Sequence, residues 1–213
     1  MPSNTTITPE WHLPRHNPFR VDRLHQLAFR GRYGSASDLL HRFEQLNRRA
    51  AIIGPHGSGK TTLVEELCEL LQTRGDSVCR LRLTSEFRSS ASGNVSDWLR
   101  DSNTSSILVL DGAEQLHWLT RVKLIWRSRS HAGLLTTSHT PCWLPTLIET
   151  QTSTDLLREL IGELAPSFDL PPTLPKQLLD RYQGDIRACL RHLYDLAASG
   201  ELQPTGYSGT TSA

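Results

Sequence analysis

The sequence has 213 residues, of which 37% are hydrophobic, and it carries a formal net charge of +1. This length can hold one α/β domain, or one domain with a small appendage, and the apolar content suffices for a core. No stretch approaches the roughly 20 apolar residues of a membrane span, and the near-neutral charge gives no global reason to expect nucleic-acid binding.

The cysteines and the first residues indicate a reducing compartment. The four cysteines show no C-x-x-C spacing, so neither a zinc site nor a disulfide framework is predicted. Residues 1–6 lack the basic and apolar regions of a signal peptide. We therefore expect a cytoplasmic protein with free thiols.

Residues 1–45 are predicted to form an N-terminal extension. Prolines predict irregular backbone over about the first 17 residues. Helical patterns follow near 21–29 and 37–46, with Ser35 or Ser37 as the N-cap of the second helix. Arginines outnumber acids in this region, as they do between residues 115 and 148. Such patches could face phosphates, but they are more often solvated or bind partners.

Residues 54–61 read G-P-H-G-S-G-K-T, which is the G-x-x-x-x-G-K-T pattern of a phosphate-binding P-loop. An apolar run at 50–53 predicts a buried strand before the loop, and leucines at helical spacing over 62–71 predict a helix after it. The helix N-terminus then faces the phosphates. The predicted nucleotide-binding residues are Gly54, Pro55, His56, Gly57, Ser58, Gly59, Lys60, Thr61 and Thr62.

Two P-loop side chains have specific tasks in this motif. Lys60 reaches the β- and γ-phosphates, and the Thr61 hydroxyl binds Mg²⁺. Residues 107–111, I-L-V-L-D, read as a buried strand that ends in a carboxylate beside the P-loop, which is a Walker B pattern. Asp111 is therefore predicted to hold the same Mg²⁺ through water.

The remaining elements complete an α/β fold. Strands are predicted at 77–83, 133–138 and 146–149, a helical turn at 95–100, and a helix over about 115–128. On that helix Leu116, Leu119, Val122, Ile125 and Trp126 share one face. Strands that alternate with helices predict a parallel sheet flanked by helices, here over residues 46–152. Residues 153–200 read as a small all-helical lid, and 201–213 as a disordered tail.

With these motifs in place, residues 45–197 resemble the P-loop ATPases of the AAA+ type. The resemblance rests on the form of the P-loop and on the helical lid that follows the core. It implies that ATP and Mg²⁺ are the ligands. Gly184-Asp185-Ile186-Arg187 looks like the sensor 2 signature, so Arg187 would reach the γ-phosphate and report nucleotide state to the lid. Alternatively, Arg187 is solvated on its own helix.

The catalytic acid departs from the family pattern. In AAA+ proteins an acid usually follows the Walker B aspartate directly, but here that position is Gly112. Glu114 is the nearest substitute, and the spacing D-G-A-E is similar to the D-G-x-[D/E] arrangement of signalling ATPases of the NACHT type. Glu114 is therefore the candidate general base. Its alternative role is that of a first-turn acid favoured by the helix dipole.

The end of the strand 133–138 should carry a polar sensor 1 residue near the γ-phosphate. Thr137, Ser138 and His139 compete for this role, and Ser138 or His139 is favoured. The segment also looks like the switch-histidine strand of transporter-type ATPases, but no L-S-G-G-Q signature accompanies it. No arginine lies between His139 and Glu149, where ring-forming AAA+ proteins usually present an arginine finger.

These features predict an ATP-dependent switch rather than a hexameric motor. Hydrolysis is expected to be slow or stimulated by a protein partner, whose identity the sequence does not give. Two alternatives stay open: an ATP-gated adaptor that does not hydrolyse, and a DNA-handling helper ATPase. A small-molecule kinase would need a catalytic acid on the strand 78–83, which has none.

Overall fold

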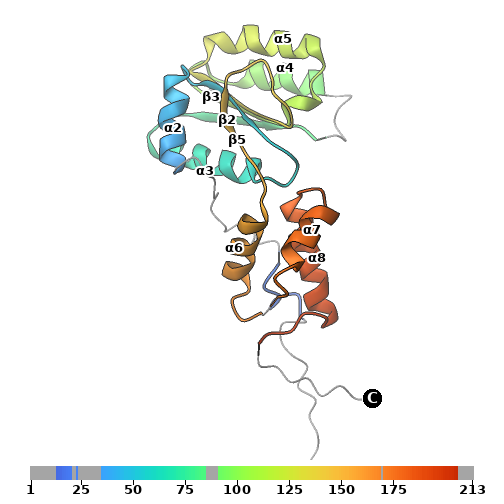
Figure 1. Cartoon of the computed structure of the whole chain (residues 1–213). Coiled ribbons are helices and arrows are strands. Elements are labelled where there is room, and N and C mark those ends of the chain that lie inside the picture. Colours follow the sequence, from blue (N-terminus) through green and yellow to red (C-terminus); the bar gives the residue numbers. More distant parts are fainter. Residues whose placement is uncertain (1–12, 21–22, 24–34, 85–90, 169, 206–213) are drawn as a thin grey trace, which may run out of the picture. The chain divides into compact units, whose positions relative to one another are not determined.

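The computed structural model describes residues 13–20, 23, 35–84, 91–168 and 170–205. The chain divides into two compact units, one formed by residues 28–151 and the other by residues 1–27 and 152–213 (Figure 1). The helix expected near 21–29 lies outside the described residues, apart from Arg23. Each unit is described by itself.

The first unit contains a five-stranded parallel sheet of order β2-β3-β4-β1-β5. The strands are β1 (Arg49–Ile53), β2 (Val78–Arg82), β3 (Ile107–Asp111), β4 (Gly133–Ser138) and β5 (Thr146–Glu149). This arrangement confirms the predicted fold class. Ile53 pairs with Ser138 and Leu110 with Thr136, so the carboxyl ends of β1, β3 and β4 meet at one edge.

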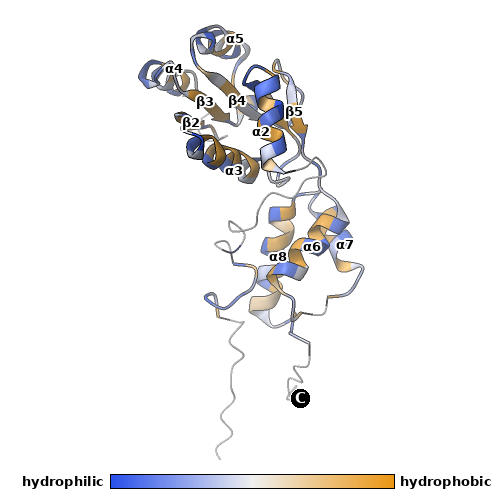
Figure 2. Cartoon of the chain, turned by 90° about the vertical axis from the view of Figure 1, so that its left-hand side faces the viewer, coloured by the Kyte–Doolittle hydropathy of each residue, from blue (hydrophilic) through white to orange (hydrophobic). Residues whose placement is uncertain are grey.

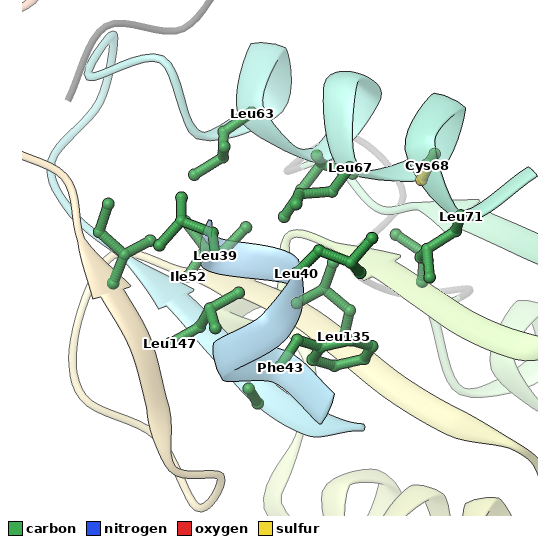
Figure 3. Close-up of a cluster of buried hydrophobic side chains, with 14 of the residues drawn as sticks. Leu39, Leu40, Phe43, Ile52, Leu63, Leu67, Cys68, Leu71, Leu135 and Leu147 are labelled. Carbon is green, nitrogen blue, oxygen red and sulfur yellow. The ribbon is translucent and has the colours of Figure 1, made fainter. Parts of the chain in front are cut away.

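Helices cover both faces of this sheet. They are α2 (Ala36–Gln45), α3 (Lys60–Thr73), α4 (Ala91–Asp101) and α5 (Trp118–Arg127), with short 3₁₀ turns η3 (Ala113–Gln115) and η4 (Ser128–Ser130). Leucines of α2 and α3 pack on Ile52, Leu135 and Leu147 of the sheet (Figure 3). Residues of α4 and α5 pack on Leu108, Leu110 and Leu134, which point to the other face. Alternate residues of each strand therefore face opposite helical layers.

Helix α2 is part of this unit and packs on its sheet, rather than in a separate extension. Its start is fixed by a capping box, because the Ser35 hydroxyl accepts from Asp38 N–H and the Asp38 carboxylate accepts from Ser35 N–H. Of the two serines considered from the sequence, Ser35 is the N-cap. The helix carries both polar and apolar residues, as an amphipathic helix does (Figure 2).

The apolar residues expected on one face of the helix at 115–128 do not lie together in the core. The α-helix begins at Trp118, after η3, and buries Thr120 and Leu124. Leu116 is buried but precedes the helix, whereas Leu119, Val122 and Trp126 are exposed. The side of the helix that carries Thr120 and Leu124 therefore packs on the core, and the apolar stripe faces outward.

The second unit contains α6 (Thr154–Leu164), α7 (Leu174–Arg181) and α8 (Ile186–Ser199) around their own apolar core. Phe19 lies in this core, far from it in sequence. Residues 201–205, predicted to belong to a disordered tail, are packed on this unit, since Leu202 is buried and Thr205 N–H donates to Ser167 O. Residues 206–213 lie outside the described part. No helix in that part is long and apolar enough to cross a membrane.

Candidate nucleotide-binding site

The P-loop connects β1 to α3 at the edge where the strands end. Gly57 and Gly59 have φ values of 68° and 83°, and Gly59 is the N-cap of α3. Backbone N–H groups in such left-handed turns form a concave nest for anions. The dipole of α3 adds positive potential at the same place. The loop geometry therefore fits phosphate.

Thr150, just after β5, fastens this loop to the sheet. Its N–H and its hydroxyl both donate to Ile53 O, at 2.7 and 3.1 Å, and its Oγ1 lies 2.6 Å from Ser58 Oγ. A Cβ at Gly54 would lie 2.1 Å from Thr150 Oγ1, so only glycine permits this approach. Sequence reasoning did not identify Thr150 as a residue of the site. The one feature that could have indicated it is its position, directly after a strand that ends beside the loop.

Lys60 is almost fully buried within its own loop, with 8% of its surface exposed. Nζ donates to Gly54 O at 2.7 Å and to Pro55 O at 2.6 Å, and lies 3.5 Å from His139 Nδ1. The ammonium group is therefore positioned over the P-loop, where the sequence placed it.

Asp111 lies beside Thr61, as the two motifs predicted. The Thr61 hydroxyl donates to Asp111 Oδ2 at 3.3 Å, and Arg82 Nε lies 3.6 Å from the same oxygen. The Thr137 hydroxyl donates to Asp111 Oδ1 at 2.5 Å and accepts from Gly112 N–H at 2.9 Å. Thr137 thus orients the Asp111 carboxylate. For the sensor 1 role at this strand end, Ser138 and His139 were favoured over Thr137 from the sequence.

The donor set around Asp111 fits magnesium. A hydroxyl and a carboxylate are hard oxygen ligands, and Mg²⁺ is usually bound by one or two such groups together with substrate phosphates. Among the described residues no group of three or more His, Cys, Asp or Glu could hold a metal ion. Thr61 and Asp111 would therefore hold Mg²⁺ jointly with a nucleotide.

Ser138 and His139 have different surroundings. The Ser138 side chain is buried, and its Oγ accepts weakly from Thr140 N–H at 3.4 Å. The His139 ring stacks on His56, with centroids 3.6 Å apart, and its Nε2 lies 3.1 Å from Glu114 Oε1. His56, one of the predicted nucleotide-binding residues, therefore helps to hold His139.

Burial lowers the pKa of His139 below its ordinary value of 6.5, and the nearby charge of Lys60 lowers it further, although Glu114 opposes the shift. The imidazole is therefore neutral near pH 7. The tautomer that fits both contacts carries its proton on Nε2, facing Glu114, and accepts at Nδ1 from Lys60.

Glu114 lies in η3, directly after the Walker B strand. One carboxylate oxygen contacts His139, while the other, Oε2, is buried with no hydrogen-bond partner in the described part of the chain. Gly112 has a φ of 93°, and a Cβ there would lie 2.5 Å from Leu83 O. Position 112 therefore has no room for an acidic side chain, and Glu114 is the first acid after Asp111.

Arg187 belongs to the helical unit, where it is the second residue of α8 and is exposed. Asp185 caps this helix by accepting from Ala188 N–H at 3.0 Å. Within the described residues no hydrogen bond or ion pair of Arg187 is found. A cation in the first turn opposes the helix dipole, so helix stability does not account for Arg187.

Solved structures share this fold at low sequence identity. AMPPCP-bound DnaA from Aquifex aeolicus has a TM-score of 0.59 at 14% identity, over 83% of this chain and 65% of that one. Cdc6p from Pyrobaculum aerophilum has a TM-score of 0.52 at 14% identity, over 84% of this chain and 66% of that one. The S. cerevisiae Hsp104:casein complex has a TM-score of 0.54 at 13% identity, over 86% of this chain and 40% of that one. The chain thus spans less than two thirds of each.

The fold and the P-loop define the chain as a P-loop NTPase-type α/β protein. Residues 50–122 match the model of the ATPase family associated with various cellular activities (AAA). This segment is therefore similar to AAA-type ATPase domains, and the chain shares the fold of the AMPPCP-bound DnaA structure. No curated protein matches the sequence. The matched segment includes Lys60, Thr61, Asp111 and Glu114.

Proposed function

We propose that the chain binds ATP with Mg²⁺ on the P-loop and hydrolyses it slowly, acting as a nucleotide-dependent switch. One observation carries the hydrolytic part. Glu114 has one carboxylate oxygen held by His139 and the other buried without a partner among the described residues. A buried free oxygen beside a phosphate-binding loop suits a base that accepts a proton from water.

In this proposal, the side chains of the site have separate roles. The P-loop N–H groups, the α3 N-terminus and Lys60 bind the phosphates, and Lys60 exchanges its loop carbonyls for phosphate oxygens. Thr61 and Asp111 hold Mg²⁺, which when bound neutralises phosphate charge. Thr137 keeps the Asp111 carboxylate in one orientation.

His139 controls the freedom of Glu114 in this proposal. While His139 contacts both Glu114 and Lys60, the carboxylate is held at one oxygen. A γ-phosphate that attracts Lys60 removes the contact between Lys60 and His139. The imidazole then serves as the sensor at the end of β4. The side chain of Ser138, the other candidate, accepts a weak hydrogen bond from Thr140 N–H.

The experiment is ATP turnover by the full chain and by Glu114→Gln, with Glu69→Gln as the matched control. Glu69 is exposed on α3, on the far side of the helix from the core. We expect phosphate release to fall by about a hundredfold in Glu114→Gln, which is typical for the loss of a general base. Equal phosphate release by Glu114→Gln and the control would refute the hydrolytic role.

An ATP-gated adaptor is the second candidate, and it is favoured by the Glu114–His139 contact, which holds the acid in place. It predicts ATP binding with no Glu114-dependent turnover. A DNA-handling helper is the third, since one similar structure is a replication initiator DnaA bound to AMPPCP and single-stranded DNA. It predicts that DNA stimulates turnover with a steep salt dependence.

A further inference from the structure

Helix α5 exposes a row of large apolar side chains. The α5 apolar face consists of Trp118, Leu119, Val122 and Trp126, which are 62%, 56%, 57% and 71% exposed. Trp118, Val122 and Trp126 are spaced four residues apart, so they form a stripe along one side of the helix. Isolated exposed apolar residues are ordinary, but a contiguous stripe with two tryptophans marks an interaction site.

The exposure of this stripe does not result from a loosely packed helix. The opposite side of α5 is firmly seated, since Leu124 is fully buried and Thr120 nearly so, in the layer shared with α4 (Figure 1). Arg121 fixes the start of the helix by donating to Leu116 O at 2.9 Å and to Glu114 O at 3.3 Å. The α5 apolar face is therefore presented to solvent on a rigid support.

The charges along this segment are all of one sign. Between residues 115 and 148 there are four cations and no acid. Lys123 and Arg129 are exposed, and Arg127 is half-buried. The fourth, Arg121, lies over the Trp143 ring at 5.3 Å as well as donating to backbone. The apolar stripe thus has a positively charged border.

We propose that the α5 apolar face is a docking surface for an acidic, amphipathic helix of a partner protein. Helix recognition uses apolar residues spaced by three or four positions, which is the spacing of the stripe. Tryptophan and arginine are the residues most enriched among those that dominate binding energy. Acidic residues on the partner helix match the cationic border.

The same observations disfavour other occupants. Two copies of this chain joined through α5 would bring Lys123 and Arg129 of each against like charges, with no acid in residues 115–148 to compensate. Single-stranded nucleic acid stacks on aromatic rings along a basic groove. Here aliphatic Leu119 and Val122 lie between the tryptophans, and of the four cations in residues 115–148 two are exposed.

The test is a display selection on the full chain, without nucleotide, using a library of helix-forming peptides randomised at every exposed position. We expect enriched peptides to carry net negative charge and apolar residues three or four apart. Binding of a synthesised winner that carries a fluorescent label is followed by fluorescence anisotropy, which does not depend on the tryptophans of the chain. Affinity should fall about tenfold or more in Trp118→Ser/Trp126→Ser.

A second variant tests the proposal even if Trp118→Ser/Trp126→Ser does not fold. Lys123→Glu/Arg129→Glu keeps the stripe and should weaken the acidic peptide, and the weakening should shrink at high salt. Lys176→Glu, on the exposed side of α7, is the charge-reversal control and should bind normally. Thermal unfolding of each variant shows whether the fold is kept.

The proposal is overturned if no peptide is enriched, if enriched peptides are basic, or if they bind the double tryptophan variant equally well. It is also overturned if the chain is a dimer that Trp118→Ser/Trp126→Ser separates. A shift of tryptophan emission with a 20-nucleotide oligo-dT, or with anionic lipid vesicles, and none with peptides, overturns it as well. Because nucleotide is absent, its failure is independent of the proposed ATPase activity.

Discussion

At the scale of single residues, two adjacent threonines of β4 have opposite surroundings. Thr137 joins the Asp111 carboxylate to Gly112 N–H, whereas Thr136 points to the other face of the sheet. The Thr136 hydroxyl is buried with no hydrogen-bond partner among the residues that the structure describes. The two positions therefore provide a matched pair of substitutions.

We expect Thr137→Val to lower ATP turnover by about tenfold or more, because a group that orients a metal-binding carboxylate is lost. Thr136→Val should keep turnover and leave the free energy of unfolding unchanged or raised by about 1 kcal/mol, because an unsatisfied buried hydroxyl is removed. Phosphate release and urea unfolding measure both. Equal loss of turnover in the two variants would contradict the orienting role of Thr137.

His139 predicts a pH dependence of stability. Its pKa is lowered in the folded chain by burial and by Lys60, so below about pH 6.5 the unfolded chain takes up a proton that the folded chain resists. The stabilisation is complete above pH 6.5 and is lost as the pH falls through the lower folded value. As the pH is lowered from 7.5 to 5.5, the thermal unfolding temperature should fall less steeply in His139→Gln than in the wild type. Parallel curves would count against this assignment.

The motif residues of the site could be predicted from sequence, and their supporting residues could not. Lys60 and Thr61 follow from the P-loop pattern, and Asp111 from a buried strand that ends in an acid. Thr150 is 92 residues from Ser58, and Thr137 is 26 residues from Asp111. Their roles depend on the order of strands in the sheet, which local patterns do not encode.

At the scale of elements, the turn after β3 determines where an acidic side chain can follow Asp111. Position 112 lies in the left-handed region and against Leu83 O, so it accepts only glycine. We expect Gly112→Glu, which would place an acid where AAA+ proteins usually have one, to lose stability without gaining turnover. The loss should exceed about 1 kcal/mol, as for a strained left-handed residue.

Gly93→Ala is the control, because Gly93 lies in α4 with nothing within 4 Å of its would-be Cβ. It should leave stability unchanged or slightly raised, since alanine favours helix. Urea unfolding compares the two variants. A Gly112→Glu chain as stable as the wild type, with faster phosphate release, would show that the turn tolerates the acid.

The strands of the buried sheet were predicted well from the sequence, and the surroundings of the surface helix α5 were not. All five strands were placed from apolar runs and alternation, because a parallel sheet buries both of its faces. The apolar side of α5 was visible in the sequence, but periodicity does not say whether such a side is buried or exposed. The sequence also does not show that Phe19 would join the core of the helical unit.

At the scale of the whole molecule, the two units carry different parts of the proposed switch. The residues predicted to bind ATP lie in residues 28–151, and Arg187 lies in the other unit. We expect Arg187→Ala to retain ATP binding but to lose the difference in hydrogen exchange of α6–α8 between the ATP-bound and ADP-bound chain. Arg191→Ala, exposed one turn further along α8, should retain it. If both variants keep the difference, Arg187 is not the reporter.

The attachment of Thr150 has a consequence for how the units communicate. Thr150 is fastened to Ser58 of the P-loop, and the helical unit begins at Thr152. Two residues span at most about 7 Å, so the covalent link between the nucleotide loop and the second unit has almost no slack. We expect a movement of Ser58 on phosphate binding to displace Thr150 and, through it, the start of the chain segment that enters the helical unit. This effect would act through the backbone and would not require Arg187.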